Sequence, residues 1–134
     1  MAQMSHAHAG LKQWHEVIEA GSTVEALSEI LHDDVVFHSP VVHTPQIGRA
    51  ITTAYLTAAS KTLGNSSFQY LREVVGDQTV VLEFQTEMDG IRVNGIDMIS
   101  FDSDGKIVDF KVMVRPLKAV NKVWEMMGTQ LAKA

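Results

Sequence analysis

Four strand-like segments separated by short turns fill the second half of this 134-residue chain, and they constrain its fold more than any other feature. β-Branched and aromatic residues dominate these segments, and Gly76-Asp77, Asp89-Gly90 and the stretch 102–105 connect them. Strands joined by turns this short pair antiparallel with their neighbours. We therefore predict a four-stranded antiparallel meander over residues 68–75, 79–88, 91–101 and 106–114.

Helical periodicity dominates the first half of the chain. A helix is predicted over residues 7–20, with Leu11, Trp14 and Ile18 on one face and Gly21 at its end. Ser22 then begins an S-x-x-E capping box for a second helix. The residues predicted to face inward from this second helix are Val24, Leu27, Ile30 and Leu31.

A short β-branched strand is predicted over residues 35–42, where Pro40 interrupts it and favours an edge position. A loop over residues 43–48 leads into a third helix. Pro116 stands at the favoured first position of a last helix. The predicted apolar stripes are Ile51, Ala54, Tyr55, Ala58 and Thr62 on the third helix, and Leu117, Val120, Trp124, Met127 and Leu131 on the last.

This order of elements predicts a single α+β domain over residues 1–134, with helices on one side of a curved antiparallel sheet. Two strands are apolar on both faces, at residues 80–82 and 112–114. One face covers the core, and the other needs a second cover. We predict a homodimer that packs through the outer sheet face, and the alternative is that the last helix covers this face.

Composition excludes several classes of protein. Hydrophobic residues make up 46% of the chain, so a core can form, and the net charge of −5 argues against a nucleic-acid partner. Basic residues form no cluster and no apolar run is long enough to span a bilayer, so we expect no membrane partner. The beginning of the chain has no signal-peptide pattern, and the expected compartment is the cytoplasm. Cysteine is absent, and His38 and His43, five residues apart, have no HExxH motif and no acidic partner at ligand spacing, so we predict neither a metal nor a cofactor.

Three stretches resemble the nuclear-transport-factor-2-like (NTF2-like) superfamily, which includes ketosteroid isomerase, SnoaL-type polyketide cyclases and limonene epoxide hydrolase. Residues 19–21 together with residues 30–35 are similar to the segment that leads into the family's first strand. Ile47-Gly48-Arg49-Ala50-Ile51 is similar to the start of the family's third helix. The stretch 95–101, followed by 104–108, is similar to its Asp-containing hairpin. The resemblance implies a cone-shaped fold around an apolar pocket. The chain is similar in particular to SnoaL-like bacterial proteins without an assigned activity. It does not imply one function, because the fold hosts many.

Asp97 is the most informative residue, because alternation places it on an apolar face with Val93, Ile99 and Phe101. An aspartate there is costly unless it is paired or protonated, and burial raises its pKa. The resemblance places it where ketosteroid isomerase has a neutral carboxylic acid that stabilises an oxyanion. The alternative is a structural aspartate paired with Arg92, Arg115 or a helix amide.

Two further positions are compared with the isomerase. Trp14 occupies the position of its oxyanion tyrosine, and an indole N–H can donate a hydrogen bond, although core packing also explains a tryptophan on this stripe. Ser39 stands before Pro40, where the isomerase has its catalytic aspartate. A serine without a neighbouring base does not abstract a proton from carbon. This departure argues against ketosteroid isomerase activity, and Gly95 argues against a limonene epoxide hydrolase, which has an arginine there.

Histidines are candidates for the missing base, because their pKa lies near neutrality. His15 shares the inward stripe of the first helix, and His43 lies on a loop near the expected pocket. His38 neighbours Ser39, but alternation points it to the opposite face. We predict Asp97, His15 and His43 as catalytic candidates. The predicted ligand-contacting residues are Trp14, His38, Ser39, Tyr55, Phe101, Phe110 and Val112.

Three functions remain open. The first is an isomerase, cyclase or hydrolase acting on a small apolar molecule through the buried Asp97 and a histidine. The second is a non-catalytic ligand-binding or carrier module, which Ser39 favours. The third is a structural dimer whose cavity is filled by side chains such as Phe110 and Val112.

Overall fold

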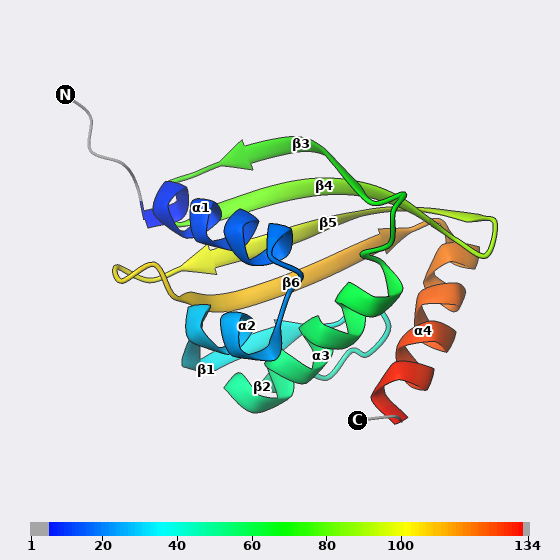
Figure 1. Ribbon diagram of the computed structural model, residues 1–134, viewed down its shortest axis with the longest axis horizontal. Coiled ribbons are helices and arrows are strands. Elements are labelled where there is room, and N and C mark those ends of the chain that lie inside the picture. Colours follow the sequence, from blue (N-terminus) through cyan, green and yellow to red (C-terminus); the bar gives the residue numbers. More distant parts are fainter. Residues whose placement is uncertain (1–5, 133–134) are drawn as a thin grey trace.

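The computed structural model describes residues 6–132, which form four helices and one six-stranded sheet (Figure 1). No helix in this part of the chain is long and apolar enough to cross a membrane. The helices are α1 (His6–Glu19), α2 (Val24–Ile30), α3 (Arg49–Thr62) and α4 (Leu117–Ala132). The strands are β1 (Leu31–His38), β2 (Gln46–Ile47), β3 (Gln69–Val75), β4 (Thr79–Met88), β5 (Ile91–Phe101) and β6 (Ile107–Arg115).

The predicted meander is confirmed, since β3, β4, β5 and β6 pair antiparallel in chain order. The whole sheet has the order β2-β1-β6-β5-β4-β3. Strand β1 lies parallel to β6, so the sheet is mixed and not purely antiparallel as predicted. The two-residue strand β2 falls in the stretch expected to be a loop, and it pairs antiparallel with β1. The predicted α+β class is confirmed.

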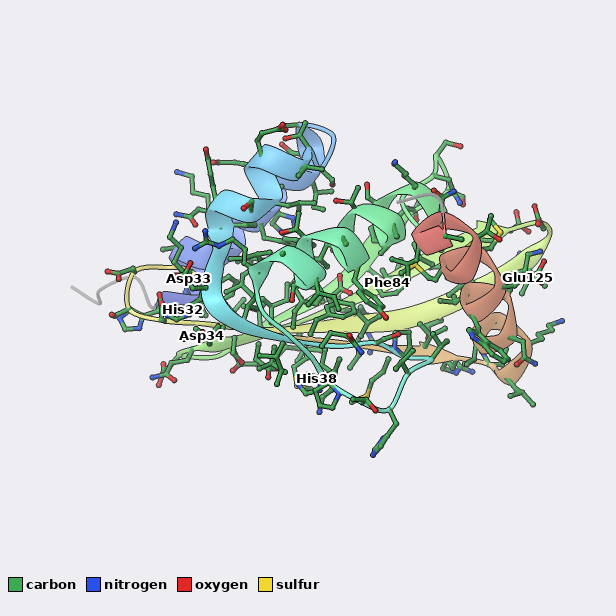
Figure 2. All side chains as sticks on the ribbon, turned by 90° about the horizontal axis from the view of Figure 1, so that it is seen from below. His32, Asp33, Asp34, His38, Phe84 and Glu125 are labelled. Atoms are coloured by element: carbon green, nitrogen blue, oxygen red, sulfur yellow. The ribbon has the colours of Figure 1, made fainter. Side chains whose placement is uncertain are left out.

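Helices α1, α2 and α3 lie on one face of the curved sheet, which becomes the inner face (Figures 1 and 2). Side chains on β4 and β5 alternate between this face and the outer one. Phe84 lies between the sheet and α3, whereas His38 projects from the opposite side (Figure 2). Helix α4 stands at one end of the sheet and packs against α3 (Figure 1). This arrangement leaves space for a cavity between the helices and the inner face.

Two helices differ in detail from the predictions. Thr23, not Ser22, caps α2, and its Oγ1 accepts a hydrogen bond from the Ala26 N–H at 3.2 Å. Ser22 instead adopts a left-handed backbone conformation with φ of 54°. Because the helix begins one residue later than predicted, Val24 lies in its first turn and is exposed. Leu31 is buried as predicted, but as the first residue of β1.

The buried stripe of α4 is also shifted from the predicted one. Leu117 and Trp124 are 75% and 65% exposed. Met127 is buried as predicted, but the other buried residues of this helix are Ala119 and Val123, which the prediction did not include. Helix α4 packs against α3 and the end of the sheet, and these contacts select the face that is buried. On α3 Ala58 and Thr62 are buried as predicted, whereas Ile51 is exposed and Thr52, Thr53 and Leu56 are buried in addition.

Candidate functional site

A cavity of about 380 Å³ lies between the inner face of the sheet and the four helices. This volume is within the range of small-molecule sites. Six of the lining residues are aromatic, and the polar ones are few. The lining consists of Trp14, Ile18, Gly21, Ser22, Leu27, Phe37, Ser39, Pro40, Leu56, Ala59, Ser60, Leu63, Gly64, Asn65, Phe68, Tyr70, Phe84, Asp97, Phe110, Val112, Val123 and Met127.

Asp97 lies in the middle of β5, between Leu82 on β4 and Val112 on β6. It lines the cavity and is only 7% exposed, so its predicted burial is confirmed. Burial raises the pKa of its carboxyl from 3.8 to about 7, while a hydrogen bond from Tyr70 acts in the opposite direction. A carboxyl group with this pKa is present in both the protonated and the ionised form near neutral pH.

The partner of Asp97 is a tyrosine, not one of the arginines considered above. The Tyr70 hydroxyl donates to Oδ2 of Asp97 at 2.8 Å. Arg115 instead donates to Oδ1 of Asn94 at 3.1 Å. No other side-chain hydrogen bond to Asp97 is found among residues 6–132. A neutral donor lowers the pKa much less than a guanidinium does, so the effect of burial prevails.

Trp14 makes a hydrogen bond that the sequence did not predict. Its indole Nε1–H donates to the Tyr70 hydroxyl oxygen at 3.1 Å. An indole has one such hydrogen, so this contact occupies the only donor of the side chain. The suggested direct donation from Trp14 to a ligand is therefore not supported. Trp14 does line the cavity, and its ring packs edge-on against Phe110 with 5.1 Å between the ring centroids.

Aromatic neighbours hold the Tyr70 ring in place. Phe68 packs edge-on against it at 5.0 Å between centroids, and the His15 ring does so at 5.7 Å. Burial and the nearby Asp97 raise the pKa of the Tyr70 hydroxyl well above 10. Tyr70 therefore keeps its proton at any physiological pH and acts as a fixed donor.

A β-bulge explains why Tyr70 reaches the cavity. The register between β3 and β4 shifts between Tyr70 and Arg72, with Tyr70 opposite Phe84 and Arg72 opposite Glu83. Without this shift Tyr70 would share the outer face with Arg72 and Val74. The sequence prediction assigned no faces to this strand and did not single out Tyr70. The available signal was that Tyr70 follows Phe68 by two residues and so shares its face.

Gly95 makes room for the aromatic wall beside this site. A Cβ atom at Gly95 would lie 2.5 Å from Cζ of Phe84 and 2.6 Å from the carbonyl oxygen of Met113. Both contacts are much closer than van der Waals contact, and one is to backbone that cannot move aside. Phe84 in turn stacks on Phe68 at 5.3 Å between centroids. A larger residue at position 95 is therefore incompatible with this wall.

Ser39 lines the cavity as predicted, but it has no base beside it. Its Oγ accepts the Val41 N–H at 3.2 Å, which is a local turn contact. Among the described residues that line the cavity, none is a histidine, lysine or arginine. Asp97 and Tyr70 are therefore the only ionisable groups in the described part of this lining.

The three candidate histidines lie outside the cavity lining. Nε2 of His15 pairs with Oε2 of Glu73 at 2.9 Å, behind the Tyr70 ring. His38 is on the outer face and pairs with Asp109 at 3.0 Å (Figure 2). His43 is exposed on the loop between β1 and β2. The prediction that His38 contacts a ligand is not supported, and the prediction that His15 or His43 acts as a base finds no geometric support.

The remaining predicted contacts divide evenly. Phe110 and Val112 line the cavity on β6, whereas Tyr55 and Phe101 do not. Tyr55 packs against Phe37 with 5.2 Å between centroids and is not among the cavity-lining residues. Phe101 is buried at the end of β5, where Gly10 of α1 lies directly against its ring. Within residues 6–132 no group of three His, Asp or Glu side chains is placed to hold a metal ion.

Comparison with known proteins identifies the family of this chain. The SnoaL-like domain matches residues 11–110, which is most of the chain. This chain belongs to the SnoaL-like domain family. Its fold is that of the NTF2-like superfamily, as the sequence resemblance implied.

Two solved structures support the assignment of this chain to the SnoaL-like family. A steroid delta-isomerase from Pseudomonas aeruginosa is 36% identical, with a TM-score of 0.90, and the match covers 99% of this chain and 96% of that one. An uncharacterised bacterial protein with a cystatin-like fold from Silicibacter pomeroyi is 28% identical, with a TM-score of 0.83, over 92% of this chain and 85% of that one.

A de novo designed protein with a curved β-sheet also superposes on this SnoaL-like protein. It is 19% identical, with a TM-score of 0.68, over 87% of this chain and 95% of the designed one. That likeness shows the fold alone, since a designed sheet carries the same architecture. No curated protein matches the sequence. The function must therefore be argued from the site.

Proposed function

We propose that this SnoaL-like protein binds a small, neutral, largely apolar molecule and exchanges a hydrogen bond or a proton with it through Asp97. The observation that supports the proposal most is a buried carboxyl, with a pKa of about 7, on the wall of an aromatic cavity. The reaction class that fits is proton transfer next to a carbonyl or enol oxygen, as in an isomerase or cyclase.

The charge of the cavity favours a neutral ligand. Asp97 is the one lining group, among the described residues, that ionises near neutral pH. An anionic ligand would find no cation in this described lining, and moving an unpaired charge out of water is very unfavourable. The aromatic side chains instead favour the flat apolar body of a ring compound.

The two protonation states of Asp97 give two kinds of contact. The protonated acid donates a hydrogen bond to a carbonyl oxygen, and the carboxylate accepts one from an enol or takes a proton. A group with a pKa near the working pH serves both steps well. The same group can therefore stabilise an enolate and return a proton to it.

The second candidate is a carrier that performs no chemistry. Ser39 favours it, because the position where the isomerase resemblance implies a base has only a hydroxyl that is engaged with Val41. The name of the Pseudomonas aeruginosa relative favours an enzyme. Turnover of a bound ketone would eliminate the carrier, and binding without any turnover across ketone and enol substrates would support it.

The pH dependence of ligand binding tests the role of Asp97. The bicyclic ketone 1-tetralone is expected to bind about ten times more weakly at pH 8 than at pH 6, because its oxygen needs the protonated acid and the Asp97 pKa is about 7. Isothermal titration calorimetry or ligand-detected NMR measures the dissociation constant.

Two controls make this test specific. The cationic analogue 1-aminotetralin is expected to show the opposite trend, since it pairs with the carboxylate. The hydrocarbon tetralin is expected to show no trend. A tetralone affinity that stays constant from pH 5.5 to pH 8.5 would contradict the assignment of Asp97 as the ligand contact.

We also propose a homodimer formed through the outer sheet face. Val74, Val81 and Met98 are neighbours across three strands, and Ile96 pairs with Met113 in the next row. Val74 is 65% exposed and Met113 is 47% exposed. The alternative cover is not found within residues 6–132, because α4 directs Val123 and Met127 into the cavity on the inner side. An apolar patch of this kind is typical of a protein interface.

Replacing two residues of this patch tests the dimer. The double variant V74E/M113E is expected to be monomeric, because carboxylates buried against a second copy would be unpaired. Val24→Glu, at an exposed apolar residue on the helical side, should leave the mass unchanged. Light scattering after size exclusion measures the mass. If the wild-type protein is a monomer at micromolar concentration, the proposed dimer is refuted.

A further inference from the structure

We propose that Tyr70, oriented by Trp14, is a positioning residue that occupies Oδ2 of Asp97 and reserves Oδ1 for the bound molecule. The ligand part of this inference rests on the proposed function. The part that concerns Asp97 itself does not, because it rests on contacts within the protein. Neither the family assignment nor the sequence prediction pointed to Tyr70.

The hydrogen bonds of this group run in one direction. The Trp14 Nε1–H can only donate, so the Tyr70 oxygen accepts at 3.1 Å. The single hydroxyl hydrogen of Tyr70 is then directed to Oδ2 of Asp97 at 2.8 Å. Oδ2 therefore acts as an acceptor whether Asp97 is neutral or ionised. When the acid is neutral, its proton is placed on Oδ1, and Oδ1 is left to meet the ligand in the cavity.

The backbone is built to bring Tyr70 to this position. Tyr70 belongs to β3, an edge strand of the sheet, and Asp97 lies two strands away on β5. The irregular register at Leu71 turns Tyr70 inward, opposite Phe84, so that its hydroxyl reaches across β4. Bulges of this type often re-aim a side chain at an active site. In a regular strand the acid would have no such donor.

The surroundings of Tyr70 restrict its ring. Phe68 and His15 both contact it edge-on, and His15 is itself held by Glu73. The ring therefore has little freedom to rotate away from Asp97. A ligand can then meet the carboxyl in one orientation only, which is the requirement for a productive proton transfer.

Removing the Tyr70 hydroxyl tests the inference. Tyr70→Phe keeps the ring and its aromatic neighbours but deletes the donor to Asp97. We expect Asp97 to bind its proton about ten times more tightly in this variant, because a hydrogen bond to an ionised group is lost. Carbon-13 NMR of the Asp97 carboxyl across pH 4 to 9 measures this directly, without any ligand.

The chain offers a matched control and a graded variant. Tyr55 is the other tyrosine of the chain and packs against Phe37 outside the cavity, so Tyr55→Phe is expected to leave the Asp97 titration unchanged. Trp14→Phe removes the donor to Tyr70 and is expected to shift the Asp97 titration in the same direction as Tyr70→Phe, but less. Circular dichroism confirms that each variant is folded.

The two parts of the inference have separate outcomes. An Asp97 titration that is unchanged in both Tyr70→Phe and Trp14→Phe overturns it, whatever the ligand does. A shifted titration together with several-fold weaker 1-tetralone binding at pH 6 supports it in full. A shifted titration in a protein that binds no tetralone supports the role of Tyr70 toward Asp97 and counts against the proposed function alone.

Discussion

Asp97→Asn is expected to make the protein more stable at pH 8, although the substitution removes a residue of the candidate site. The Asp97 carboxyl is buried, and burial raises its pKa from 3.8 to about 7. The ionised form is therefore held in the folded protein against its preference for water. Asparagine has the same shape, still accepts the Tyr70 hydroxyl, and carries no charge.

The direction of the pH dependence follows from proton linkage. Below pH 3.8 the carboxyl is protonated in both the folded and the unfolded chain, so its titration does not change the free energy of unfolding. Between pH 3.8 and about 7 the folded chain holds the proton more tightly, and the free energy of unfolding decreases as the pH rises. Above about pH 7 the carboxyl is ionised in both the folded and the unfolded chain, and the free energy of unfolding stays at its lowered value. A rise of about three pKa units corresponds to a loss of roughly 4 kcal/mol.

Urea unfolding at a series of pH values measures this effect. The difference in unfolding free energy between Asp97→Asn and the unchanged chain should be small at pH 4. It should grow to about 2–4 kcal/mol in favour of the variant at pH 8, where the lost charge-assisted hydrogen bond offsets part of the gain.

An exposed aspartate provides the control for this experiment. Asp104 lies in the turn between β5 and β6, and Asp104→Asn should follow the unchanged chain at every pH. If Asp97→Asn were instead less stable by a constant amount from pH 4 to pH 8, Asp97 would be a structural carboxylate with a normal pKa. The proposed function would then lose its main support.

The strands of the meander were predictable because their local signals agree. β4 and β5 have the predicted bounds, since alternation and the Asp89-Gly90 turn fix the same register. The parallel pairing of β1 with β6 was not predictable in this way. It joins segments about seventy residues apart, such as Phe37 and Phe110, and no local pattern encodes that contact.

The helical stripes show where periodicity alone is insufficient. On α4 the residues Leu117 and Trp124 continue a regular apolar repeat, yet both are exposed. The repeat shows which residues are apolar, but packing against α3 and the end of the sheet selects the face that is buried. The same reasoning applies to His15, which shares a stripe with Trp14 but lies at the edge of the buried face.

Three strand residues of the candidate site lie where alternation places them, whereas Tyr70 depends on a local irregularity. Asp97, Phe110 and Val112 lie on regular strands, and each lines the cavity as predicted. Tyr70 lies beside a bulge that reverses its face, and a single sequence does not reveal where a bulge will occur. The chemistry of Asp97 depends on that tyrosine, so the sequence identified the acid but not the group that orients it.

The prediction with the largest expected effect on chemistry concerns Ser39. The isomerase resemblance implies a catalytic aspartate directly before the proline, and this chain has Ser39 before Pro40 on the cavity wall. Ser39→Asp is expected to increase the isomerisation of a Δ5-3-ketosteroid about 100-fold or more over the unchanged protein, the usual contribution of a positioned base. The formation of the conjugated ketone is followed by ultraviolet absorbance.

The physical reason combines two carboxyl groups with different tasks. The carboxylate introduced by Ser39→Asp would take the proton from the carbon between the carbonyl and the double bond and return it two carbons further along. Asp97, which is protonated below its pKa of about 7, would donate to the oxygen that becomes negative in between, so the assay is run at pH 6. The turn should tolerate the change, because an aspartate oxygen can accept the Val41 N–H as the Ser39 hydroxyl does.

Ser39→Asn separates the charge of the new residue from its shape. Asparagine fills the same space and accepts the same backbone hydrogen bond but cannot take a proton, so this variant should remain as slow as the unchanged chain. Adding Asp97→Asn to Ser39→Asp should lower the gained rate, since an amide N–H stabilises the developing oxyanion less than a carboxylic acid does. If the wild-type protein already isomerises the steroid as fast as Ser39→Asp, a base other than residue 39 acts in this cavity. Asp97 would then be the group to test first, because it is the described lining carboxylate that ionises near neutral pH.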